Sequence, residues 1–222
     1  MMTPIRVLIV DDDALVRAGL VMMLREASDI EVVAEAGDGH EALNVLAHTE
    51  ADLVLMDIRM PQLDGLSATE IIRARPRPPE VVVLTTFDAD AHIHRALSAG
   101  AAGFLLKDTP PRQIVESIRR IADGEPVLSP SVLKALIERT FAGETATRAT
   151  EVRVRLAVLN ERERNVADDV GSGMSNAEIA DHLYIAIPTV KTHVSAAMAK
   201  LGLSNRVQLA LLVHEAKLTG SA

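Results

Sequence analysis

The chain has 222 residues, no cysteine and a formal net charge of −8. Without cysteine it can form no disulfide, thiol nucleophile or cysteine-metal site. No apolar run reaches the ~20 residues that span a bilayer, and the N-terminus lacks the basic segment and apolar run of a secretion signal. We therefore expect a cytoplasmic protein without a membrane segment.

Residues 1–124 alternate short apolar runs with helical patterns and carry the acidic excess, with 20 acidic and 12 basic side chains. Four of the five runs are nearly continuous in Val, Ile, Leu and Met, which is typical of parallel strands covered on both faces. This pattern predicts a doubly wound, flavodoxin-like α/β domain with a five-stranded parallel sheet in the order 2-1-3-4-5. The predicted strands are 5–10, 31–36, 52–56, 80–85 and 103–106.

Charged and hydroxyl side chains follow four of these strands. The first and third strands would be neighbours at the topological switch point, which brings Asp11, Asp12 and Asp57 into one crevice. Carboxylates ~4 Å apart repel by roughly 4 kcal/mol at an effective dielectric near 20, so a cation is expected among them. Their oxygens suit Mg²⁺. Thr85 and Lys107 would bring a hydroxyl and an ammonium group to the same crevice.

Taken together, the motifs VDDD, MDIRMP, VLTT and LLKD make residues 5–122 resemble the receiver domain of bacterial two-component response regulators. The resemblance implies that Asp57 is the phosphoacceptor for a sensor histidine kinase. It also implies that Asp12, Asp57 and the backbone carbonyl of Arg59 bind Mg²⁺ directly, while Asp11 acts mostly through water.

The same resemblance implies a switch. Thr85 and Lys107 would bind the phosphoryl oxygens, and Phe104 matches an aromatic residue that moves with the threonine. Because Phe104 lacks the hydroxyl of the commoner tyrosine, we expect a switch based on packing alone. Asp13 is expected to start the first helix as a capping or first-turn carboxylate.

Two other functions share parts of this pattern. Haloacid-dehalogenase-like phosphatases also use an aspartate and magnesium, but they carry a general acid two residues after the nucleophile, where this chain has Arg59. A flavin-binding flavodoxin-like protein would need a Ser/Thr-rich phosphate loop after the first strand. We therefore expect a switch protein and no enzyme.

Residues 125–155 are predicted to be a linker with one helix. Ser129 would cap that helix, Pro130 would lie in its first turn and Gly143 beyond its end. The alternation of apolar residues over 152–158 suggests either a strand or an extended linker, and we favour the linker.

Residues 156–222 predict a small all-α domain of four helices. Asn160 with Glu163 and Ser175 with Glu178 have the spacing of capping boxes, and Gly173 falls where the first helix should end. The tight connection LYIAI between the second and third helices indicates a helix-turn-helix. The third helix is expected to begin near Pro188 or Thr189, and the fourth to run from about Ser204 to Lys217.

The motifs SNAEIA, TVKTHV and KLGLSNR resemble the DNA-binding domain of NarL/LuxR-type regulators. The resemblance implies that the helix over 188–200 enters the major groove of promoter DNA. The residues that face bases would be Lys191, Thr192 and Ser195. On or near the outer face would also lie Thr189 and His193. The DNA backbone would be contacted by Lys200 and Arg206.

Three residues depart from the family pattern. Asp169 replaces a usual leucine and needs solvent or a partner, Ala186 removes the usual serine cap, and Ser195 replaces a frequent lysine. With 7 acidic and 6 basic side chains in residues 156–222, we expect few phosphate contacts and a shallow salt dependence.

The prediction for the whole chain is a phosphorylation-controlled transcription regulator that forms a homodimer and binds two half-sites. The last helix would either dimerise the domain or serve ordinary core packing. A regulator that binds other proteins and no DNA remains the alternative.

Overall fold

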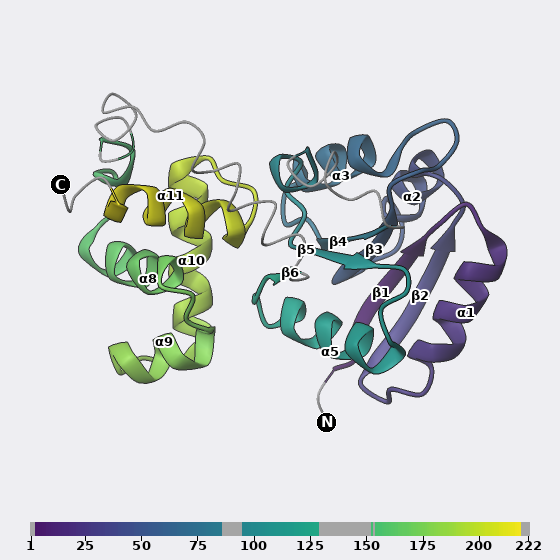
Figure 1. Cartoon of the computed structure of the whole chain (residues 1–222), viewed down its shortest axis with the longest axis horizontal. Helices are drawn as coiled ribbons and strands as arrows, with labels where there is room; N and C mark the ends of the chain where they lie inside the picture. The colour runs from purple at the N-terminus through teal and green to yellow at the C-terminus, as the bar shows by residue number, and fades with distance from the viewer. Residues whose placement is uncertain (1–2, 86–94, 129–151, 153, 219–222) are drawn as a thin grey trace. The chain divides into compact units, whose positions relative to one another are not determined.

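The computed structural model describes residues 3–85, 95–128, 152 and 154–218 (Figure 1). The chain divides into two compact units, residues 1–135 and 136–222. Among the described residues, none of the helices combines the length and apolar character needed to cross a membrane.

The first unit is built on an all-parallel sheet in the order β2-β1-β3-β4-β5-β6. The predicted order 2-1-3-4-5 is confirmed, and β6 adds two residues beside β5. A strand this short has no readable periodicity, which is why the sequence did not reveal it. The strands are β1 (Ile5–Val10), β2 (Ile30–Ala36), β3 (Leu53–Asp57), β4 (Glu80–Thr85), β5 (Gly103–Leu106) and β6 (Val127–Leu128).

Helices cover both faces of this sheet (Figure 1). On one face, Leu20 and Ile118 pack against Leu55 and its neighbours, and on the other, Ala42 and Ile72 pack against the opposite side of the strands. Burial on both faces explains the continuous apolar runs. The covering helices are α1 (Ala14–Leu24) and α5 (Pro111–Ala122) on the first face, and α2 (Gly39–Val45) and α3 (Gly65–Arg73) on the second.

The second unit contains the four expected helices. Both predicted capping boxes are present, and Gly173 follows the first helix with φ +82°. Ile179, Val190 and Leu209 are fully buried in a single core shared by these helices. The helices are α8 (Glu161–Gly171), α9 (Asn176–Leu183), α10 (Ile187–Leu201) and α11 (Arg206–Leu218).

The segment before α8 differs from the prediction. Val152 and residues 154–156 are helical, and Val152 and Leu156 pack into the core while Val154 and Val158 are exposed. The strand or extended linker expected over 152–158 is therefore wrong, because the buried pair is spaced by one helical turn. The predicted helix that involves Ser129, Pro130 and Gly143 lies outside the described residues.

Candidate functional site

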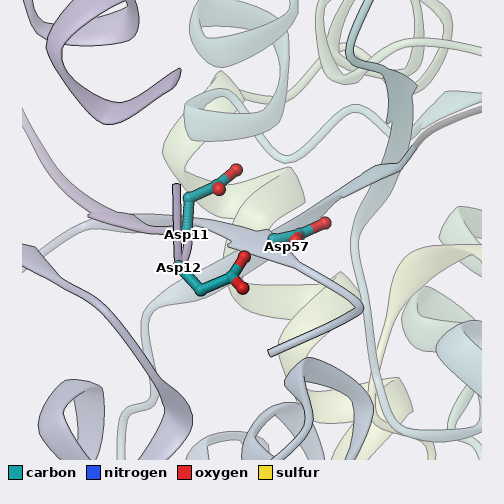
Figure 2. Close-up of side chains that lie close together, drawn as sticks. All are labelled: Asp11, Asp12 and Asp57. Carbon is teal, nitrogen blue, oxygen red and sulfur yellow. The ribbon is translucent and has the colours of Figure 1, made fainter. Parts of the chain in front are cut away.

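Three carboxylates meet at the carboxyl ends of β1 and β3 (Figure 2). The two strands pair with Val10 opposite Met56, so the residues that follow them lie side by side. One oxygen from each of Asp11, Asp12 and Asp57 lies within 4.8 Å of the others. Asp11 and Asp57 are buried, whereas Asp12 is exposed. The structure thus brings together the three carboxylates predicted for the metal site.

Lys107 reaches the same crevice from the end of β5. Its backbone N–H donates to the carbonyl oxygen of Thr85 at 2.8 Å, and its Nζ lies 2.6 Å from Asp11 Oδ2 and 3.2 Å from Asp57 Oδ2. Burial lowers the pKa of Lys107, but the two carboxylates outweigh that effect and the net pKa is raised. Lys107 is therefore a stable cation that offsets part of the negative charge.

The surroundings of Asp57 in this crevice disfavour its ionised form. Its Oδ1 accepts a hydrogen bond from the Ile58 N–H at 2.8 Å. Burial raises the pKa of Asp57, and the Asp11 carboxylate adds to this rise, whereas Lys107 and the Ile58 N–H oppose it; the net pKa is raised. A further cation beside Asp57 would therefore favour its ionised, nucleophilic form.

Thr85 and Phe104 lie on one face of the sheet. Phe104 pairs with Val83, and Val83 and Thr85 alternate onto the same face of β4. Both Thr85 and Phe104 are buried. The predicted hydroxyl and aromatic residue thus point to the same face of the sheet, two positions apart in the register of β4 and β5. Arg59 lies two residues beyond β3 and is exposed.

Gly65 fixes the start of α3 against the end of β3. Its N–H donates to the Ile58 carbonyl oxygen at 3.0 Å, and the Asp64 side chain caps the helix. A β-carbon at Gly65 would overlap the carbonyl oxygen of Asp57 and lie 2.9 Å from its carbonyl carbon. The sequence alone did not reveal the role of Gly65. Its signal was a glycine, a poor helix former, directly after a capping aspartate.

The donor set fits a magnesium ion. Three carboxylate groups supply hard oxygen donors, and an ion of this kind usually combines one or two carboxylates with water and a phosphate group. The exposed Asp12 leaves an open side for such ligands. The roles of the individual site residues, including the Arg59 carbonyl, stay predictions.

In the second unit, α9 and α10 are joined by a turn that contains Tyr184 in the left-handed conformation, with φ 54°. On α10, Val190, Val194, Ala197 and Leu201 are buried in the core. The predicted DNA-facing residues occupy the remaining surface: Thr189, Thr192 and Ser195 are exposed, and Lys191 and His193 are half-buried.

The two predicted backbone contacts have partners inside the unit. Lys200 Nζ lies 2.7 Å from Glu163 Oε2, although the lysine is still partly exposed. Arg206 is only 8% exposed, and its guanidinium donates to Asn176 Oδ1 and to the Met174 carbonyl oxygen, each at 2.6 Å. Arg206 therefore differs from the expected surface cation, because it fastens the start of α11 to the start of α9.

Two family models together match most of the chain. The model of the response regulator receiver domain matches residues 7–119, and that of the luxR family of bacterial regulatory proteins matches residues 157–213. The chain belongs to the LuxR-type response regulators. Both predicted resemblances are confirmed, and the protein is a transcriptional regulator by family.

Known relatives match this response regulator over nearly their whole length. Transcriptional regulatory protein LiaR of Bacillus subtilis is 36% identical over 211 residues, which cover 95% of this chain and 97% of LiaR. The probable transcriptional regulatory protein NarL of Mycobacterium tuberculosis is 39% identical over 202 residues, with 91% and 90% covered. Among solved structures, the response regulator ChrA of a heme-sensing two-component system has a TM-score of 0.53 at 35% identity, with 98% and 100% covered.

Asp169, which departs from the family pattern, contacts His182, a partner that the sequence did not reveal. Its side chain is 10% exposed, and Oδ2 lies 2.9 Å from Nδ1 of His182, a side chain that is 58% exposed. The pair joins α8 to α9, the two helices that precede α10. A histidine thirteen residues away carries no sequence signal for this contact, because it depends on how the helices pack.

We expect His182→Ala to destabilise the second unit by about 1–3 kcal/mol, because it leaves the buried Asp169 carboxylate without its partner. Asp169→Leu removes the buried charge and should cost little or stabilise the unit. In the Asp169→Leu background, His182→Ala should then cost almost nothing. Urea unfolding of the four proteins measures this coupling, and equal costs of His182→Ala in both backgrounds would contradict it.

Ala186 leaves α10 without a side-chain cap, as the sequence predicted. We expect Ala186→Ser to stabilise α10 by about 0.5 kcal/mol, the low end for a cap, because Pro188 has no N–H and the Thr189 N–H, which the serine would share, already donates to the carbonyl oxygen of residue 186. The reverse change, Ser175→Ala, removes a side-chain cap from α9. It deletes the hydrogen bond that Ser175 Oγ accepts from the Glu178 N–H and should destabilise α9 by about 1 kcal/mol. Amide hydrogen exchange of α10 and α9 in the full chain measures both, and unchanged protection in α10 would count against the first.

Proposed function

We propose that this response regulator accepts a phosphoryl group on Asp57 from a sensor histidine kinase, then dimerises and binds promoter DNA through α10. The observation that supports it most is the crevice at the ends of β1 and β3, where Asp11, Asp12 and Asp57 stand beside Lys107. A cytoplasmic location follows from the proposal, because both the kinase transmitter and the DNA are met there.

The chemistry at Asp57 is phosphoryl transfer. An Asp57 carboxylate oxygen forms a bond to phosphorus, the bond from phosphorus to the donor's histidine nitrogen breaks, and the nitrogen keeps the electron pair. Magnesium bound by Asp12 and Asp57, with the Arg59 carbonyl, would neutralise charge on the transferring oxygens. Lys107 is close enough to exchange its carboxylate partners for a phosphoryl oxygen.

Phosphorylation of Asp57 would be transmitted to the rest of the domain by side chains of the sheet. A phosphoryl oxygen on Asp57 offers Thr85 an acceptor, and Phe104 on the same face can repack into the space that the threonine vacates. Both residues are buried, so their movement must displace neighbouring side chains. This supports a packing-based switch, and no hydroxyl on Phe104 is required.

The residues of this site favour a phosphoaspartate that persists over one that is rapidly hydrolysed. A phosphatase of the haloacid-dehalogenase type needs a general acid two residues after the nucleophile, and Arg59 there cannot donate a proton in the same way. We therefore propose a switch without phosphatase turnover.

The DNA side of the proposal depends on the exposed face of α10, with Lys191, Thr192 and Ser195 at the base-facing positions and Thr189 and His193 beside them. Lys200 can add a phosphate contact from its exposed part. Arg206 is proposed as a positioning residue only. In α11, Leu209, Leu212 and Val213 are buried within the unit's own core. Much of the apolar surface of α11 that could have served a dimer is thus used inside the unit.

Selection of random DNA by the full chain, with and without beryllofluoride and magnesium, tests this function while oligomeric state is monitored. We expect a dimer and an enriched two-half-site sequence with beryllofluoride. Lys191→Ala combined with Thr192→Ala should abolish specific binding and leave beryllofluoride-induced dimerisation intact. Enrichment of no sequence in either state would favour a regulator that acts on proteins instead of DNA.

A further inference from the structure

Arg17 of α1 reaches back to the end of β1, where the acidic crevice begins. Its Nη1 donates to the carbonyl oxygen of Asp11 at 2.6 Å, and its Nε lies 3.6 Å from Oε2 of Glu35 on β2. The Arg17 side chain is only 21% exposed. Because a guanidinium is a rigid, planar set of donors, Glu35 orients the group that holds the Asp11 carbonyl. Arg17 thus connects α1 and β2 to the peptide group that follows Asp11.

Each polar group of Asp11 is held by a neighbour. Its N–H donates to the Ala36 carbonyl oxygen at 3.1 Å, its Oδ1 accepts from the Asp13 N–H at 3.0 Å, and its Oδ2 lies 2.6 Å from Lys107 Nζ. Arg17 binds the remaining group, the carbonyl oxygen. The position of Asp11 is therefore fixed by contacts to β2, to both ends of the first turn of α1 and to the residue after β5.

Asp12 has no such contacts of its own. In the part of the chain that the structure describes, its exposed side chain makes no hydrogen bond or ion pair. Its carboxylate nevertheless lies beside those of Asp11 and Asp57 (Figure 2). The planar peptide group between Asp11 and Asp12 contains the carbonyl that Arg17 binds, so this bond sets the direction in which Asp12 leaves the strand. Arg17 therefore acts on Asp12 through the backbone.

We propose that Arg17 is a positioning residue of the magnesium site, which keeps the Asp12 carboxylate directed into the crevice by holding the Asp11 carbonyl. This inference rests on the proposed phosphorylation of Asp57 with magnesium, and it gives a role to a residue outside the crevice. Loss of a side chain that orients a metal ligand typically weakens metal binding by about tenfold or more. The positive charge of Arg17 repels Mg²⁺, so the positioning effect has to exceed this repulsion.

The charge and the hydrogen bond of Arg17 have opposite effects on Mg²⁺ affinity, and calorimetric titration of the full chain with Mg²⁺ alone separates them. If Arg17 acted only as a charge, Arg17→Ala would bind Mg²⁺ more tightly than the wild type, because a repulsion is removed. We expect the reverse, a dissociation constant raised about tenfold. Arg17→Lys keeps the charge and a donor for the Asp11 carbonyl, so its affinity should lie between those of Arg17→Ala and the wild type.

Arg25→Ala is the matched control, because it removes the same charge from the exposed C-cap of α1 and should bind Mg²⁺ as the wild type does. An arginine that merely fastened α1 would lower the stability of Arg17→Ala to urea and leave the Mg²⁺ affinity of the folded protein unchanged. Affinity of Arg17→Ala equal to or above that of the wild type overturns the proposal and leaves the proposed function intact. If the wild type itself binds no Mg²⁺, the proposed function is wrong and this inference falls with it.

Discussion

Asp57→Asn is expected to abolish phosphoryl incorporation from acetyl phosphate and to make the first unit more stable at neutral pH. An amide oxygen is a poor nucleophile and asparagine fits the same space, so labelling should be lost without loss of the fold. The matched control is Asp13→Asn. Asp13 caps α1 through the Leu15 N–H at 2.8 Å, and asparagine caps a helix equally well, so this variant should be labelled normally.

The stability change follows from the raised pKa of Asp57, which burial causes chiefly, with Asp11 adding to it. Between the ordinary value of 3.8 and the raised value, the folded protein binds more protons than the unfolded chain. Stability therefore falls as the pH rises through this window and stays lower above it. Asparagine does not ionise and so avoids this loss of stability. The gain in the free energy of unfolding of Asp57→Asn should therefore vanish at pH values below this range.

Amide hydrogen exchange of β3 in the full chain, compared at neutral and acidic pH, measures this difference. Undiminished labelling of Asp57→Asn would show that the phosphoacceptor is another residue. Equal protection of β3 in both proteins at neutral pH would contradict the electrostatic part of the prediction.

The strand order and the carboxylate crevice could be predicted because they depend on local and periodic features. Continuous apolar runs mark buried parallel strands, and a charged residue at the end of such a run has only the crevice or solvent to enter. The capping residues Asn160 and Ser175 were predictable for the same reason, since their partners lie three residues along the chain.

Contacts between distant segments were not predictable. Arg206 looked like a surface cation, but the packing of α11 on α8 buries its guanidinium, which donates to Asn176 at the start of α9. His182 and Asp169 pair for the same reason. One missed feature did have a local signal: Asn205 accepts from the Gln208 N–H at 2.8 Å, with the same three-residue spacing as the two capping boxes.

Gly65→Ala is expected to destabilise the first unit by about 3 kcal/mol or more and to impair phosphorylation of Asp57. The added β-carbon would overlap the carbonyl oxygen of Asp57, a backbone atom that no side-chain rotation can move away. Relief requires the end of β3 or the start of α3 to shift. Either shift would break the bond from the Gly65 N–H to Ile58 and displace the Asp57 carboxylate from its neighbours.

Gly19→Ala is the matched control, because it makes the same chemical change in α1, where no atom outside the adjacent residues and the helix's own backbone lies within 4 Å of the added carbon. It should stabilise the protein by about 0.5–1 kcal/mol, since alanine loses less backbone entropy in a helix. Urea unfolding and acetyl phosphate labelling of both variants measure the contrast. If Gly65→Ala unfolds at the parental urea concentration, or is labelled as fast as Gly19→Ala, the close approach of α3 to β3 does not hold the phosphoacceptor in place.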